Sequence, residues 1–153
     1  LEMEKLQKEG LTRSIGVSNF RKSHLQNLLS KVHIVPSINQ IETNPQMVDE
    51  ETIQYCKENK IGVEAWSPLG SGACLNNPKI QEIANKYQKS SAQIILRWLL
   101  QKGIVILPKS VHENRIKENI DLFNFVLENE DVELINQLNQ HKRTGPDPDN
   151  FDF

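Results

Sequence analysis

A lysine, a serine and an arginine lie close together near the C-terminal end of the sequence, and together they have the chemistry of an anion site. The apolar run Ile104–Leu107 predicts a buried strand, and the segment LPKSVHENRIKEN, 107–119, overlaps its end. Ser110 followed three residues later by Glu113 is a capping-box pattern, which predicts a helix that begins at Ser110. An ammonium group at Lys109, a hydroxyl at Ser110 and a helix N-terminus would together suit a phosphate.

The same segment predicts a helix face that extends this site. Arg115, Glu118 and Asn119 stand at positions i, i+3 and i+4, so one face of a helix would carry all three. A guanidinium grips phosphate oxygens in pairs, and with Lys109 nearby it favours a phosphate that offers several free oxygens. On spacing alone, a tight proline turn followed by a solvated surface helix explains the segment equally well.

Length and composition predict a globular protein with one core. The 153 residues carry a net charge of -2, which gives no positive field for a nucleic-acid partner. No apolar run reaches the length of a membrane span, Cys56 and Cys74 form no CxxC pair, and the histidines show no metal-ligand spacing. We therefore expect a reduced, cytoplasmic protein without a structural metal or a membrane partner. The chain begins at Leu1 rather than Met, so we expect an upstream segment.

Helices and strands alternate along the sequence, as turn residues and apolar spacing indicate. Helices are predicted over Leu1–Glu9, Arg21–Ser30, Met47–Asn59, Pro78–Tyr87, Ser91–Lys102 and Asp131–His141. Strands are predicted around Ile15 and Val17, over Ser37–Glu42, over Ile104–Leu107 and within Ile61–Gly70, where the strand runs into a Pro and Gly turn. The tail GPDPDNFDF, 145–153, is predicted to be irregular. Repeated βα units of this kind predict an α/β fold with a parallel sheet.

Polar residues follow the predicted strands, at the edge of a parallel sheet where ligands bind. We expect one shared site to be faced by Ser18, Asn19, Gln40, Trp66, Ser67 and Lys109. Four βα units are half of a closed barrel, and they would leave two outer strands without partners. Either the chain is part of a longer one, or it forms an open doubly wound sheet.

Five segments together resemble the aldo-keto reductase family, in the family's order and spacing: GLTRSIGVSNF, SINQIETNP, GVEAWSPLG, SAQIILRW and LPKSVHENRIKEN. The resemblance covers nearly the whole chain, and the tail is similar to that of small bacterial members. The family's fold is a (β/α)8 TIM barrel. The resemblance therefore implies that residues 1–153 form the last four βα units, the cofactor-binding C-terminal half of a barrel that is incomplete in this chain.

The resemblance implies a site for NADP(H). Lys109, Ser110 and Arg115 would hold the 2'-phosphate of NADPH, and Glu118 and Asn119 would hold the adenine. The nicotinamide at the other end of NADPH carries a carboxamide group, and an amide side chain can both donate to this group and accept from it.

At the nicotinamide end of that site, the resemblance implies that Ser18, Asn19 and Gln40 hydrogen-bond the carboxamide. Trp66 would stack on the nicotinamide ring, and Ser67 and Leu69 would belong to the loop over the pyrophosphate. Gly70 and Gly72 form a GxG pattern without the third glycine of a Rossmann motif, so that motif is not predicted.

The function implied is the NADPH-dependent reduction of small aldehydes or ketones by a full-length monomer. The family's catalytic tyrosine, lysine, aspartate and histidine lie on the first four strands, so no residue of this chain is predicted to be catalytic. Three alternatives stay open. The chain could belong to a non-catalytic NADPH-binding regulatory subunit, or be a fragment without activity of its own. It could also form a half-barrel that pairs with a second copy.

Overall fold

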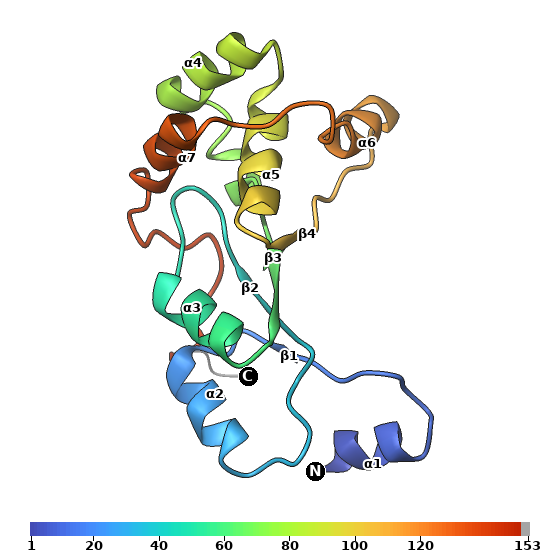
Figure 1. Cartoon of the computed structure of the whole chain (residues 1–153). Coiled ribbons are helices and arrows are strands. Elements are labelled where there is room, and N and C mark those ends of the chain that lie inside the picture. Colours follow the sequence, from blue (N-terminus) through green and yellow to red (C-terminus); the bar gives the residue numbers. More distant parts are fainter. Residues whose placement is uncertain (151–153) are drawn as a thin grey trace.

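Four short parallel strands form the centre of the structure, a computed structural model that describes residues 1–150 (Figure 1). The strands are β1 (Val17–Ser18), β2 (Ile38–Glu42), β3 (Gly62–Trp66) and β4 (Val105–Ile106). They lie side by side in sequence order, and each neighbouring pair is parallel. A doubly wound sheet would reverse this order at a switch point. The α/β fold is therefore a consecutive arc of a barrel, as the sequence predicts, and the doubly wound alternative is wrong.

A helix or a pair of helices separates the strands along the chain (Figure 1). The helices are α1 (Glu2–Lys8), α2 (Lys22–Leu29), α3 (Glu50–Glu58), α4 (Pro78–Tyr87), α5 (Ser91–Gln101), α6 (Glu113–Ile120) and α7 (Asn129–Asn136). A short 3-10 turn, η1 (Gly70–Gly72), follows β3 in a segment where the sequence predicts only a loop. Within the described residues 1–150, no helix is both long and apolar enough to cross a membrane.

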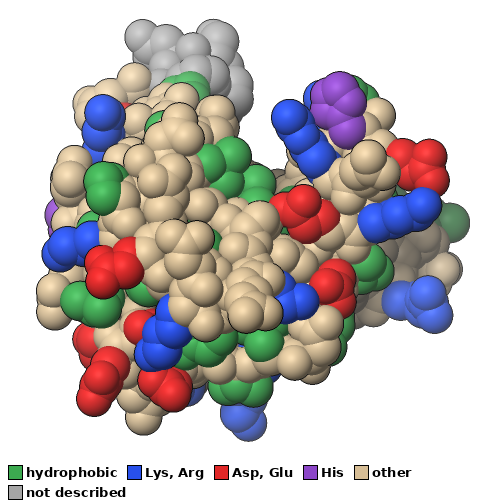
Figure 2. Space-filling model, turned by 90° about the horizontal axis from the view of Figure 1, so that it is seen from above, with side chains coloured by type: hydrophobic (Ala, Val, Ile, Leu, Met, Phe, Trp, Pro, Cys, Tyr) green, Lys and Arg blue, Asp and Glu red, His purple; other side chains and the backbone are tan. Residues whose placement is uncertain are grey.

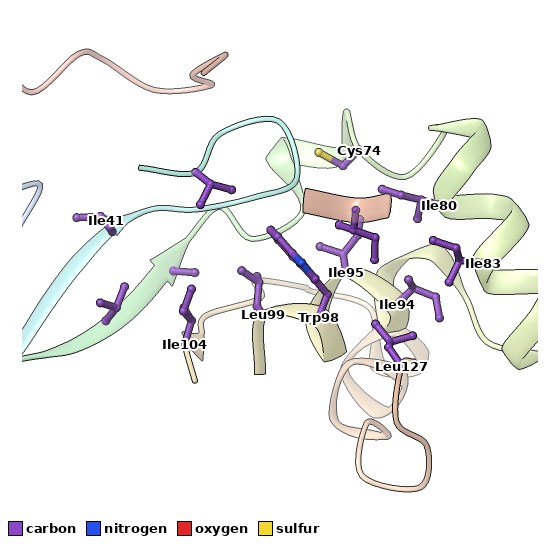
Figure 3. Close-up of a cluster of buried hydrophobic side chains, with 14 of the residues drawn as sticks. Ile41, Cys74, Ile80, Ile83, Ile94, Ile95, Trp98, Leu99, Ile104 and Leu127 are labelled. Carbon is purple, nitrogen blue, oxygen red and sulfur yellow. The ribbon is translucent and has the colours of Figure 1, made fainter. Parts of the chain in front are cut away.

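The core lies between one face of the sheet and the helices (Figure 3). Side chains alternate between the two faces of a strand, so Ile41 of β2 and Ala65 of β3 point into this core. Trp98 and Leu99 of α5 are fully buried beside them. The opposite face carries polar side chains, and Gln40 Nε2 donates to Glu64 Oε2 there at 2.9 Å.

Three predicted helices begin or end at other residues in the structure. α3 begins at Glu50 rather than Met47, because the Asp49 carboxylate accepts the Thr52 N–H and caps the helix there. α7 runs from Asn129 to Asn136 instead of from Asp131 to His141, since the chain after it pairs with another loop. α6 begins at Glu113 and not at Ser110.

Asp131 fastens α7 to α4. Its buried carboxylate accepts from Lys86 Nζ at 2.8 Å and from the Tyr87 hydroxyl at 2.5 Å. Burial alone would raise the pKa of Asp131, but the two hydrogen bonds outweigh burial and hold that pKa below its usual value. A carboxyl group with a lowered pKa in the folded state adds stability above the unfolded pKa. That stability is lost as the pH falls through the folded value.

We expect Asp131→Asn to lower the free energy of unfolding by about 2 kcal/mol at pH 7, because the Lys86 and Tyr87 donors lose a charged acceptor. The difference from the wild type should shrink below about pH 4, where the unfolded carboxyl is protonated. Urea unfolding at pH 7 and pH 3 measures both values. Glu128→Gln, which removes a more exposed partner of Lys86, is the control and should have a small effect. If Asp131→Asn lowers the free energy of unfolding equally at pH 7 and pH 3, the result contradicts this account.

Candidate functional site

A hollow of about 850 Å³, which we call the α6 cleft, lies between α6 and the loop that follows β3. Seen from above, the molecule is notched beside a lobe that carries basic side chains (Figure 2). The cleft is lined by these predicted site residues: Ser67, Leu69, Lys109, Ser110, Arg115, Glu118 and Asn119. The structure therefore gathers the proposed phosphate and adenine residues around one space, as the sequence predicts.

Within residues 1–150, Lys109 and Arg115 of the α6 cleft form no ion pair with an acidic side chain. Lys109 is exposed at the end of the β4 segment, and Arg115 is exposed on the first turns of α6. Among the ion pairs of residues 1–150, Lys117 on the same helix pairs with Glu113 at 2.7 Å, but none involves Lys109 or Arg115. Two unpaired cations at one cleft favour an anionic ligand.

The capping box predicted at Ser110 is wrong. His112 is the N-cap of α6, and no side-chain cap hydrogen bond is formed there. The Ser110 hydroxyl instead accepts the N–H of His112 at 3.1 Å, two residues on, in a serine turn. This turn keeps Ser110 in the wall of the cleft, one residue after Lys109.

Ser90 is a cleft residue that the site prediction missed. Its hydroxyl donates to Glu118 Oε1 and accepts the Gln93 N–H, so one side chain caps α5 and holds α6. The Gln93 side chain completes a capping box by accepting the Ser90 N–H at 3.0 Å. The S-x-x-Q pattern at Ser90 was the available signal for this N-terminus. Sequence spacing alone does not place it beside Glu118.

A second hollow, the Trp66 cleft, has a volume of about 580 Å³ and is lined in part by Ser18, Asn19 and Trp66. Trp66 Nε1 donates to Asn19 Oδ1 at 2.8 Å, which joins the end of β3 to the end of β1. Asn19 and Ser67 both adopt positive φ angles, 58° and 52°. Non-glycine residues rarely adopt this conformation, and it is concentrated at functional sites.

The structure divides the predicted strand-end residues between the two clefts. Ser67 and Lys109 line the α6 cleft, whereas Ser18, Asn19 and Trp66 line the Trp66 cleft. β1 and β4 are three strand spacings apart, about 14 Å, so their ends cannot converge on one small ligand. Gln40 lines neither cleft, because its amide lies on the open face of the sheet against Glu64.

Cys56 and Cys74 are both free and buried, and burial raises the pKa of each thiol. Neither thiol is therefore activated as a nucleophile. Within the described part of the chain, no group of three or more histidine, cysteine, aspartate or glutamate side chains could hold a metal ion.

An arc of parallel βα units, with two clefts beyond the carboxyl ends of its strands, defines an α/β barrel type of protein. The model of the Aldo/keto reductase family matches residues 1–140, and the chain belongs to this family. The resemblance carried by the five sequence segments is thereby confirmed.

Curated relatives cover the chain almost completely. An uncharacterized oxidoreductase, YtbE, of Bacillus subtilis is 51% identical over 99% of this chain and 54% of its own length. The glyoxal reductase of Bacillus subtilis is 49% identical over 99% of this chain and 55% of its own. Methylglyoxal reductase DkgA of Escherichia coli is 45% identical over 97% of this chain and 55% of its own. The chain thus spans about half the length of these relatives.

Solved structures superpose closely on the fold. A Gox0644 mutant in complex with NADPH matches with a TM-score of 0.95 and 38% identity, over 99% of this chain and 56% of that one. A Bombyx mori aldo-keto reductase in complex with NADP matches with a TM-score of 0.89 and 41% identity, over 96% and 51% of the two chains. Both matches span about half of the longer protein.

Proposed function

We propose that this chain is the cofactor-binding C-terminal half of an NADPH-dependent aldo-keto reductase. The observation that carries the proposal is the α6 cleft, in which Lys109 and Arg115 line one space and form no ion pair within residues 1–150. Two cations beside an adenosine ribose favour the 2'-phosphate that NADPH carries and NADH lacks. The structures with bound NADPH and NADP support the same assignment.

The residues of the two clefts have different tasks in this proposal. In the α6 cleft, Lys109, Ser110 and Arg115 hold the 2'-phosphate, and Glu118 and Asn119 hold the adenine. Ser67 and Leu69 lie on the loop directly after Trp66, so they cover the pyrophosphate between the two clefts. An extended dinucleotide can span both clefts, whereas a small ligand cannot.

At the other end, Ser18, Asn19 and Gln40 bind the carboxamide and Trp66 covers one face of the nicotinamide. Asn19 Oδ1 already accepts from Trp66 Nε1, so its NH2 group is the part left to donate to a carboxamide oxygen. Gln40 must turn from Glu64 toward the cleft to reach the same group. When bound, NADPH supplies the hydride. Because Trp66 covers one face of the nicotinamide, the hydride can be transferred only from the other face.

The substrate class proposed is small aldehydes and ketones, and glyoxal and methylglyoxal are the first to test. The glyoxal and methylglyoxal reductases among the relatives support this choice. In this proposal the proton for the carbonyl oxygen comes from the other half of the barrel. We expect the complete protein to act as a monomer in the cytoplasm.

Loss of nicotinamide absorbance after methylglyoxal is added to the complete protein and NADPH tests the activity. Consumption of one NADPH for each carbonyl reduced supports the reductase. Tight binding of NADPH without consumption, for every small carbonyl tried, would instead favour the non-catalytic binding subunit.

A further inference from the structure

The C-terminal tail, residues 139–150, runs from α7 back toward the connection between β1 and α2 (Figure 1). Its first part is fixed to the loop after β2. Asn139 Oδ1 accepts the Val48 N–H at 3.1 Å, and Asn139 Nδ2 donates to the Val48 carbonyl at 2.9 Å. The N–H groups of Gln140 and Lys142 both donate to the Gln46 carbonyl.

Glu42, the last residue of β2, fixes the middle of the tail. This residue is only 2% exposed, and its carboxylate accepts the N–H and the hydroxyl of Thr144, each at 2.6 Å. The Gly145 N–H donates to the same carboxylate at 3.4 Å, and Arg143 Nη1 lies 3.9 Å away. Charge-assisted hydrogen bonds to a buried carboxylate are strong and directional. They hold residues 143–145 in one place.

The last described part of the tail is fixed to α2. Arg21, the N-cap of α2, pairs with Asp147 at 2.7 Å and also with Asp149. Pro146 lies between the two attachments and Pro148 lies between Asp147 and Asp149, and both prolines line the Trp66 cleft. The tail therefore forms one wall of this cleft and is held on both sides of it.

Gly145 lies directly against the indole of Trp66. A Cβ atom at this position would come within 2.4 Å of Trp66 Cη2 and 3.2 Å of Cζ3, so only a residue without a side chain fits. The other edge of the indole donates its N–H to Asn19 Oδ1. The ring is therefore held between a hydrogen bond at one edge and a fixed backbone at the other.

We propose that Glu42 and Gly145 are positioning residues for Trp66: Glu42 fixes the tail, and Gly145 of the tail supports the indole that faces the nicotinamide. Neither residue needs to touch the cofactor. The consequence for NADPH binding rests on the proposed function, whereas the placement of the indole does not. The two parts can therefore be tested separately.

The indole N–H signals in a ¹H–¹⁵N spectrum of the chain test the placement. Trp66 and Trp98 give one signal each, and Trp66→Phe assigns them. Gly145 has no positive φ, so Gly145→Ala fits the backbone and acts through the contact with the indole. We expect Gly145→Ala and Glu42→Gln to shift the Trp66 signal and leave the Trp98 signal in place. Glu51→Gln, at an exposed carboxylate, should shift neither. An unmoved Trp66 signal in Gly145→Ala overturns the proposal.

Binding of NADPH and of 2',5'-ADP tests the consequence. Gly145→Ala should weaken NADPH binding about tenfold, because part of the stacking energy on Trp66 is lost. Binding of 2',5'-ADP should stay the same, because this part of the NADPH molecule contains no nicotinamide. Equal weakening of both ligands would overturn the positioning role. Failure of the wild-type chain to bind either ligand would count against the proposed function, and the indole signals would still decide the placement of Trp66.

Discussion

Replacing Arg115 with alanine is expected to weaken NADPH binding about 30-fold and to leave NADH binding unchanged. The guanidinium lines the α6 cleft and makes no ion pair within residues 1–150, so a 2'-phosphate would be its main partner. A hydrogen bond to a charged group contributes about 1.5–3 kcal/mol, and 2 kcal/mol corresponds to about 30-fold. Fluorescence titration of NADPH and NADH measures both affinities.

Lys117→Ala is the matched control for this change. Lys117 lies on the same helix and has the same charge, but it pairs with Glu113 and does not line the cleft. Its removal should change NADPH affinity less than about twofold, because an exposed pair contributes little. If both variants weaken NADPH and NADH equally, the effect is a general loss of charge, and the 2'-phosphate site is assigned wrongly.

Replacing Trp98 with alanine is expected to have the largest effect on stability, a loss of about 3–5 kcal/mol in the free energy of unfolding. Trp98 is fully buried in the core between the sheet and the helices (Figure 3). Its Nε1 also donates to Asn136 Oδ1 at 2.9 Å, which ties α5 to the end of α7. Alanine leaves a cavity and removes this donor. Urea unfolding followed by circular dichroism measures the loss.

Trp66→Ala is the comparison for this second prediction. Trp66 is only half-buried and lines a cleft, so its removal leaves less of a cavity and should cost clearly less stability. Its expected effect is on NADPH binding instead. Equal losses of stability for the two tryptophans would contradict the division between a core tryptophan and a cleft tryptophan.

The strands and the residues after them were predictable because their signals are local. Apolar runs such as Ile104–Leu107 and the helix spacing of Arg115, Glu118 and Asn119 need no knowledge of distant parts of the chain. The start of α6 was not predicted correctly. At Ser110 a capping box and a serine turn use the same hydroxyl, and the sequence does not decide between them.

The contacts that join distant segments could not be predicted. Thr144 and Glu42 are 102 residues apart, and their hydrogen bonds exist only because the tail crosses the end of β2. Ser90 and Glu118 are 28 residues apart, and their hydrogen bond lies in the lining of the α6 cleft. The division into two clefts also depends on how far apart β1 and β4 lie in the sheet. The strand-end residues of the sequence do not reveal this distance.

The affinity of the 153-residue chain for 2',5'-ADP relative to 5'-AMP, measured by isothermal titration calorimetry, tests the central claim most directly. The two ligands differ only in the phosphate that Lys109 and Arg115 are proposed to hold. We predict that 2',5'-ADP binds at least about tenfold more tightly, and that this advantage falls as salt is added. Equal affinity for the two ligands would contradict the assignment of the α6 cleft.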